Sequence, residues 1–230
     1  MAKKNVETSE LETLGTEAMS KTEHFFEENG QKIVMAIVAI VAVAVAIFGY
    51  NALVVEPKED RAADMIYAAQ AIFESGAPDF QLALEGDAST IGLLEVIENY
   101  SSTKSGNLAY HYAGICYLKL GDLNNAQRYL AKYKAQKGAP AMIVNAQNIG
   151  LQGDIAVDQS NYAAAVELFT KAANNYKNDL TTPIFLRKAG MAAQAAGNKA
   201  QAKELFESVV DLYPNSQESA TAAKLLNAIK

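Results

Sequence analysis

The apolar positions of the chain form one continuous run, followed by a long stretch in which apolar and polar residues recur with a helical period. The run extends from Ile33 to Val55, 23 residues without a charge. A helix of that length measures about 34 Å, against about 30 Å for the hydrocarbon core of a bilayer. We therefore predict a single transmembrane helix at 33–55, preceded by an acidic tail at 1–32 and followed by a soluble domain at 56–230.

The main alternative for the apolar run is a cleaved signal peptide. Such a peptide has a short basic region before a core of about 7 to 15 residues. Here the 32 residues before the run carry seven Glu and four Lys, and the run is longer than such a core. We therefore expect the span to stay in the protein.

The acidic tail contains positions spaced three or four apart that predict one short amphipathic helix ending at Gly30. These positions are Leu11, Leu14, Ala18, Thr22 and Phe25. Such a helix would dock on a cytoplasmic partner or on the membrane surface. A loosely ordered acidic tail fits the same residues, and both interpretations stay open.

Residues 56–230 contain three windows in which a Gly is followed twelve residues later by an Ala. The pairs are Gly114 and Ala126, Gly153 and Ala165, and Gly190 and Ala202, with spacings of 39 and 37 residues between the glycines. The small residues let the two helices of a hairpin cross closely, and the large residue four positions after each Ala is expected to pack on the next hairpin. This pattern is typical of tetratricopeptide repeats (TPRs).

The repeats are assigned to about 107–140, 146–179 and 183–216, with a degenerate repeat at about 61–100 and a capping helix at about 216–229. In the capping helix we expect four residues to face inward: Ala220, Ala223, Leu226 and Ile229. No stretch alternates with the period of a strand. The predicted fold class is all-α, with an N-terminal single transmembrane helix followed by a TPR-like α-solenoid.

Composition narrows the classes of function. The net charge is -6 and the pI is about 5.1, without a basic block, which argues against nucleic-acid binding. The single cysteine, Cys116, excludes an intramolecular disulfide and a cysteine-based zinc site. We expect it to be a small buried apolar residue.

Residues that would carry catalysis are sparse. The two histidines, His24 and His111, have no second metal ligand at helical spacing, and the chain lacks a phosphate-binding glycine loop. Asp154 and Asp158 lie one helical turn apart, but a solvated or partner-facing surface explains them better than paired acid catalysis. We expect a non-enzymatic protein with no catalytic residue, no cofactor and no bound metal.

TPR arrays bind partners through the concave surface lined by the first helix of each hairpin. Counting from the aligned glycines places nine residues there. They are His111, Ile115 and Lys119 in the first repeat, Gln147, Asp154 and Asp158 in the second, and Arg187, Met191 and Gln194 in the third. The mixture indicates recognition of a peptide or protein by polar contacts and a few apolar ones, and an ordinary solvated face is the alternative.

One use of such a groove is the carboxylate clamp, which holds the C-termini of chaperones with Lys, Asn, Asn, Lys and Arg. In this chain the corresponding positions carry His111, Ile115, Leu151, Ile184 and Lys188. We therefore expect a ligand of another kind.

The order of these parts resembles the YfgM-like family, single-span TPR proteins of Gram-negative inner membranes. Residues 25–32, FFEENGQK, are similar to a Phe-Phe-x-Glu-Asn-Gly-x-Lys stretch at the same place in that family. Residues 103–109, 114–118 and 182–186 look more like relatives from the Bacteroidetes. The resemblance covers nearly the whole chain.

The resemblance implies a cytoplasmic N-terminus and a periplasmic repeat domain, anchored in the bacterial inner membrane. It also implies partners: Sec translocon subunits, a membrane-anchored periplasmic prolyl-isomerase-like chaperone, or exported polypeptides. Charge alone leaves the orientation open, because the 20-residue windows on the two sides of the span each hold two basic residues.

The resulting hypothesis is a membrane-anchored, non-enzymatic protein-interaction module that is ancillary to the Sec translocon. The alternative is a TPR scaffold for another envelope assembly, in secretion, outer-membrane biogenesis or cell division.

Overall fold

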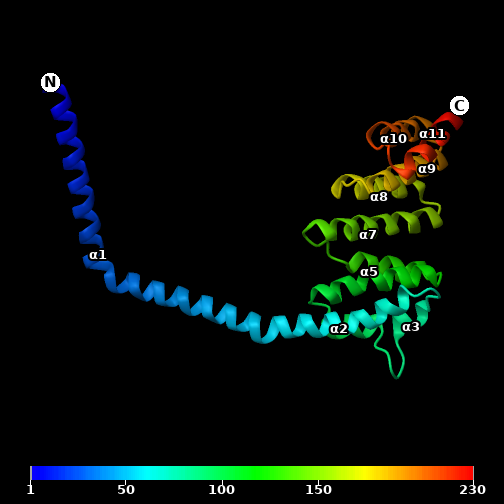
Figure 1. The fold of residues 1–230 in the computed structure, drawn as a ribbon, viewed down its shortest axis with the longest axis horizontal. Helices are drawn as coiled ribbons and strands as arrows, with labels where there is room; N and C mark the ends of the chain where they lie inside the picture. The colour runs from blue at the N-terminus through cyan, green and yellow to red at the C-terminus, as the bar shows by residue number, and fades with distance from the viewer. Residues whose placement is uncertain (1, 230) are drawn as a thin grey trace. The chain divides into compact units, whose positions relative to one another are not determined.

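The computed structural model describes the backbone of residues 2–229 and the side chains of residue 25 and residues 27–229 (Figure 1). The chain divides into two compact units, Met1–Pro57 (unit 1) and Lys58–Lys230 (unit 2). The predicted amphipathic face of the tail rests on Leu11, Leu14, Ala18 and Thr22, whose side chains lie outside the described residues.

Unit 1 is helical from its first described residue. Helix α1 spans Ala2–Tyr50, and a short π-helix, η1, follows at Asn51–Val55. The prediction that a helix ends at Gly30 is wrong, because α1 continues through this residue. A glycine inside a helix costs only about 1 kcal/mol relative to Ala, which the long flanking helical segments tolerate.

The apolar run lies within this continuous helical stretch. Among the described residues, one helix, Glu27–Phe73, is long and apolar enough to cross a membrane. Side chains along it are largely uncovered, with Val38 60%, Ile40 68% and Val45 66% exposed. Apolar residues exposed on all sides of a helix need an apolar surrounding that unit 1 itself does not provide.

Unit 2 consists of helices stacked in chain order from α2 to α11 (Figure 1). No strand occurs among its described residues. The helices are α2 Glu56–Phe73, which begins in the last residues of unit 1, α3 Phe80–Glu85, α4 Leu93–Tyr100, α5 Lys104–Lys119, α6 Leu123–Lys132, α7 Ala139–Asp158, α8 Tyr162–Asn175, α9 Thr182–Ala195, α10 Lys199–Leu212 and α11 Gln217–Ala228. The segment assigned to a degenerate repeat therefore contains three helices, α2 to α4.

Three hairpins, α5–α6, α7–α8 and α9–α10, turn in the same way. Two residues beyond the end of each first helix lies a residue with positive φ: Gly121 at 82°, Ser160 at 59° and Gly197 at 81°. The next residue, Asp122, Asn161 or Asn198, then caps the second helix by accepting a hydrogen bond from a backbone N–H three residues on. A left-handed residue followed by an N-cap reverses the chain within three residues, which explains the recurring Gly-Asp and Gly-Asn signals.

The aligned glycines let the two helices of each hairpin approach closely. A Cβ placed on Gly114 would lie 2.5 Å from Leu130, one on Gly153 2.6 Å from Phe169, and one on Gly190 2.5 Å from Phe206. The large residue of the second helix therefore packs on the glycine of its own hairpin. The prediction that it packs on the next hairpin omitted this contact within the hairpin. Phe169 makes both contacts, because it also stacks on Phe185 of α9, with ring centroids 6.4 Å apart.

The apolar interior of unit 2 falls into two main clusters. One joins α2 to α5 around Ile66, Leu84 and Leu93, and the other joins α7 to α11 around Phe169 and Phe206. A small third cluster, Ala126, Leu130 and Ile155, connects the first hairpin to α7.

The terminal helix α11 buries a face that matches the predicted one only in part. Ser219 and Ala222 are buried, while Ala220 is exposed. The prediction is wrong for Ala220, whereas Leu226 and Ile229 are half-buried and pack on the apolar cluster as predicted.

Candidate partner-binding groove

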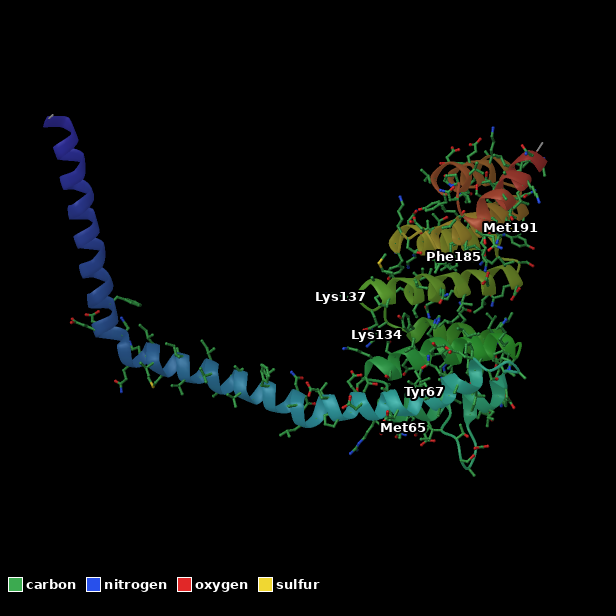
Figure 2. The ribbon with its side chains drawn as sticks, in the orientation of Figure 1. Met65, Tyr67, Lys134, Lys137, Phe185 and Met191 are labelled. Carbon is green, nitrogen blue, oxygen red and sulfur yellow. The ribbon has the colours of Figure 1, made fainter. Side chains whose placement is uncertain are left out.

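The first helices of the three hairpins, α5, α7 and α9, line a groove in unit 2. Its central hollow has a volume of about 420 Å³. The walls are mainly apolar: Tyr112, Ile115, Val144, Leu151, Ile184 and Phe185. Most of these side chains are half-buried, whereas Phe185 is buried within the stack (Figure 2).

A second hollow, of about 310 Å³, lies between α7, α8 and α9. Val157, Phe169 and Met191 give it an apolar lining. The two hollows share Asp154 and Lys188, whose Nζ lies 2.8 Å from Asp154 Oδ1 and 2.9 Å from Oδ2. A single ion pair thus separates two apolar surfaces along the groove.

The structure brings together some of the nine predicted groove residues. His111, Ile115, Gln147 and Asp154 line the central hollow. Asp154, Arg187 and Met191 line the second one.

The remaining three, Lys119, Asp158 and Gln194, line neither hollow and are exposed near the C-terminal ends of α5, α7 and α9. The last residues of each first helix thus lie outside the lining of both hollows. Six of the nine predicted residues therefore line a hollow and three do not, and their role in binding a partner stays a prediction.

His111 is engaged within the fold rather than open to a ligand. Its side chain is 3% exposed, and its Nδ1 lies 3.3 Å from Nδ2 of Asn148 on α7. Because an amide N–H donates, Nδ1 is the acceptor and the imidazole is neutral. Burial lowers the pKa of His111 from 6.5 to about 4.

Arg187 also has protein partners. Its Nε donates to Glu218 on α11, and its Nη1 lies 2.9 Å from the sulfur of Met191. The guanidinium therefore ties α9 to the terminal helix, and Met191, 45% exposed, is the freer of the two residues (Figure 2).

Sequence reasoning did not include several residues that form the groove. Leu151, Ile184 and Lys188 line the central hollow beside His111 and Ile115. These five are the positions at which a carboxylate clamp would carry its basic and amide side chains. The positions of the carboxylate clamp were therefore the sequence signal for the floor of the groove. In this chain three of them, Ile115, Leu151 and Ile184, make that floor apolar.

A second feature missed in the sequence is a pair of buried asparagines that hold the linker between α6 and α7. Asn107 on α5 donates to the carbonyl of Lys134 and accepts from its N–H, both at 2.8 Å. Asn145 on α7 does the same with Gln136, at 2.8 and 3.0 Å, and also accepts from the Tyr133 hydroxyl at 2.8 Å. The linker is thus fixed as an extended chain by side-chain amides.

Cys116 lies in the interior of unit 2 and is fully buried. Burial raises the pKa of its thiol to about 12, so the thiolate required of a nucleophile is not formed near neutral pH. Among the described residues, no group of three or more His, Cys, Asp or Glu is placed to hold a metal ion.

Comparison with known families supports the repeat assignment. The family model described as Tetratricopeptide repeat matches residues 108–136 and 186–216, which cover most of α5–α6 and α9–α10. Unit 2 is an all-α TPR solenoid. A search of curated proteins found no match. TPRs serve as protein-interaction modules, typically without catalysis.

Proposed function

We propose that this protein is a non-enzymatic, membrane-anchored interaction module, an ancillary subunit of the Sec translocon that binds periplasmic chaperones or emerging polypeptides. The observation that carries the proposal is the apolar floor of the groove. Ile115, Leu151 and Ile184 come from three successive first helices and line one hollow. Apolar side chains gathered in a concave surface favour a ligand with apolar side chains of its own.

The dimensions fit an extended polypeptide. Packed helices lie about 8–10 Å apart, and an extended chain advances about 3.3 Å per residue. Successive first helices therefore contact side chains about three residues apart in such a ligand. The Asp154–Lys188 pair supplies one donor and one acceptor group within reach of the ligand backbone.

Two further observations support a non-enzymatic role. Asp154, the better placed member of the predicted acid pair, is neutralised by Lys188, and Asp158 lies outside both hollows. The buried thiol of Cys116 offers no nucleophile. The membrane anchor rests on the apolar helix, and the orientation and the Sec association rest on the resemblance to the YfgM-like family.

The proposal is tested by photo-crosslinking in the native membrane. A photoreactive amino acid replaces Ile184 in the groove or, as a matched control, Lys171, which is exposed on α8 and lines neither hollow. We expect translocon subunits, a periplasmic chaperone or exported polypeptides to crosslink at position 184 and not at position 171.

Groove crosslinks to components of secretion, outer-membrane biogenesis or cell division would favour the alternative scaffold. Absence of translocon subunits, chaperones and exported chains would refute the proposal. A reporter active only in the periplasm, fused after Lys230, tests the topology separately. An inactive but expressed fusion would place the groove in the cytoplasm and contradict the proposed topology.

A further inference from the structure

The average acidity of the chain conceals two segments of opposite charge in unit 2. Residues 58–100 hold nine Asp or Glu and two Lys or Arg. Residues 101–153 hold six Lys or Arg and a single acid, Asp122. Burial does not require this separation, since the charged residues concerned are not buried.

The topology separates the basic linker from several acidic loops, although Glu59 and Asp60 of the acidic segment lie in the first turns of α2. We call the end at which α2 begins the tether end, because the chain reaches it from the apolar run. The α6–α7 linker lies at this end and carries Lys134 and Lys137, and the start of α2 at the same end carries Glu59 and Asp60. The loops that follow α2 and α5 lie at the opposite end and carry Glu74, Asp79 and Asp122. Figure 2 shows Lys134 and Lys137 at the side of the stack from which α2 enters it.

Hydrogen bonds fix the linker at the tether end. The Glu59 carboxylate, in the first turns of α2, accepts from the backbone N–H of Lys104 at 2.9 Å. Asn107, three residues further along α5, holds Lys134 through its two 2.8 Å hydrogen bonds. The linker thus lies about one helical turn of α5 away from the start of unit 2.

Three lysines form what we call the linker patch: Lys132, Lys134 and Lys137. All three are exposed, and within the described part of the chain none is paired with a carboxylate. Lys132 Nζ lies 5.6 Å from the ring centroids of both Tyr110 and Tyr129. The patch therefore combines unneutralised positive charge with aromatic rings, a combination that suits the boundary between water and lipid.

We propose that the linker patch binds anionic lipid headgroups of the membrane that holds the apolar helix. Three residue steps separate Val55 from Lys58, so the start of unit 2 lies within about 11 Å of the end of the apolar run at any angle between the units. This tether keeps the membrane surface permanently within reach, which favours lipid over an acidic protein that must diffuse to the patch. Leu180, 61% exposed in the α8–α9 loop at the same end, adds an apolar contact.

The inference rests on the anchoring part of the proposed function and is independent of the Sec translocon. Docking would hold the repeat domain against the bilayer. Each lysine near an anionic surface shifts the equilibrium by about fivefold, and the attraction falls with added salt.

The test uses the full-length chain in nanodiscs of phosphatidylcholine alone or mixed with phosphatidylglycerol, each containing a headgroup-labelled quencher lipid. A fluorophore is attached through Ala135→Cys in the linker or, as a control, through Gln159→Cys in the α7–α8 loop; both positions are exposed. The native Cys116 does not compete because it is buried. We expect quenching at position 135 in anionic discs only, and little at position 159.

Charge variants decide between the outcomes. Lys132→Gln/Lys134→Gln/Lys137→Gln should reduce the ratio of docked to free protein at least about tenfold. Lys199→Gln/Lys203→Gln/Lys224→Gln removes the same charge from α10 and α11 and should leave docking unchanged.

Quenching that is equal in neutral and anionic discs, or that survives in the linker-patch variant, would overturn the proposal. A response to soluble polyglutamate with none to anionic lipid would overturn it in favour of an acidic protein partner. A chain that fails to co-elute with the discs would refute the anchoring, and this inference with it, whatever the translocon experiment gives.

Discussion

The three hairpins of unit 2 are built alike, but the two junctions between them are not. The first, between α5–α6 and α7–α8, contains an extended linker held by Asn107 and Asn145. The second, between α7–α8 and α9–α10, has Phe169 stacked on Phe185 and Phe185 packed against Gly150 of α7. Its loop is held by local hydrogen bonds between Asn178 and Thr181 or Thr182, and not by an asparagine of another helix.

This difference separates two ways of joining repeats. The apolar junction gains free energy from buried area and tolerates small displacements. The polar junction gains little net free energy per hydrogen bond, but losing one partner leaves the other buried and unsatisfied. It therefore fixes the position of one hairpin on the next, and it lies where the apolar interior divides into its two main clusters.

The largest effect is expected at the apolar junction. Phe185→Ala should lower the free energy of unfolding of unit 2 by about 4 kcal/mol, because it leaves a cavity against Phe169 and Gly150. Phe185→Leu, which keeps much of the volume, should cost clearly less. Urea denaturation followed by circular dichroism measures both, and a loss below about 1 kcal/mol for the alanine variant would contradict the role of this junction.

The polar junction should respond to pH through His111. Its imidazole titrates near 6.5 in the unfolded chain and near 4 in the fold, where burial disfavours the charged form. The unfolded chain therefore binds more protons in this window, and stability present above pH 6.5 is lost as the pH falls towards 4, by about 3 kcal/mol in total. Denaturation across this range should show a shallower pH dependence for His111→Gln. Equal slopes for the two proteins would exclude His111 as the cause.

Removing one of the two asparagine side chains that hold the linker should lower the free energy of unfolding less than either of these changes. Asn145→Ala should lower the free energy of unfolding by about 2 kcal/mol, since the N–H and carbonyl of Gln136 lose their partner. Hydrogen exchange should quicken at Gln136 first and remain slow in α9. Gln147→Ala, at an exposed position two residues on, is the control and should leave exchange of the linker unchanged. An unchanged exchange rate at Gln136 in Asn145→Ala would show that the amide does not hold the linker.

The smallest effect tests whether the hairpins themselves are equivalent. Ser160 adopts the positive φ that glycine supplies at Gly121 and Gly197. Ser160→Gly should raise the free energy of unfolding by about 0.5 kcal/mol, while Gly197→Ala should lower it by about 1 kcal/mol. Thermal denaturation would show these changes as a small rise and a small fall of the midpoint. Effects of the same sign would mean that the turns differ despite their common backbone.

Several features of the fold were predictable because they depend on neighbours in the sequence. The Gly–Ala spacing predicted three hairpins because a Cβ at Gly114, Gly153 or Gly190 would collide with the opposing helix. The turn signals predicted where first helices end, since only a few residue types adopt a left-handed backbone. The all-α solenoid is confirmed for these reasons.

The candidate groove was predictable only in part. Ile115 and Met191 line its hollows as expected, but Lys119, Asp158 and Gln194 lie beyond them. The face of a helix follows from its period, whereas the length over which that face is covered depends on the neighbouring hairpin. The same dependence explains the error at Ala220, whose helix is oriented by α9 and α10.

The sequence by itself determined the elements of this protein: an apolar helix long enough to cross a membrane and a series of helical hairpins. These follow from local sterics and from the period of apolar residues. Only the tertiary structure showed that Asn107 and Asn145 hold a linker by hydrogen bonds and that His111 is buried. It also showed that the lysines of the linker lie near the point where the chain enters unit 2. Each of these depends on which helix packs against which, and that contact brings together residues far apart in the chain.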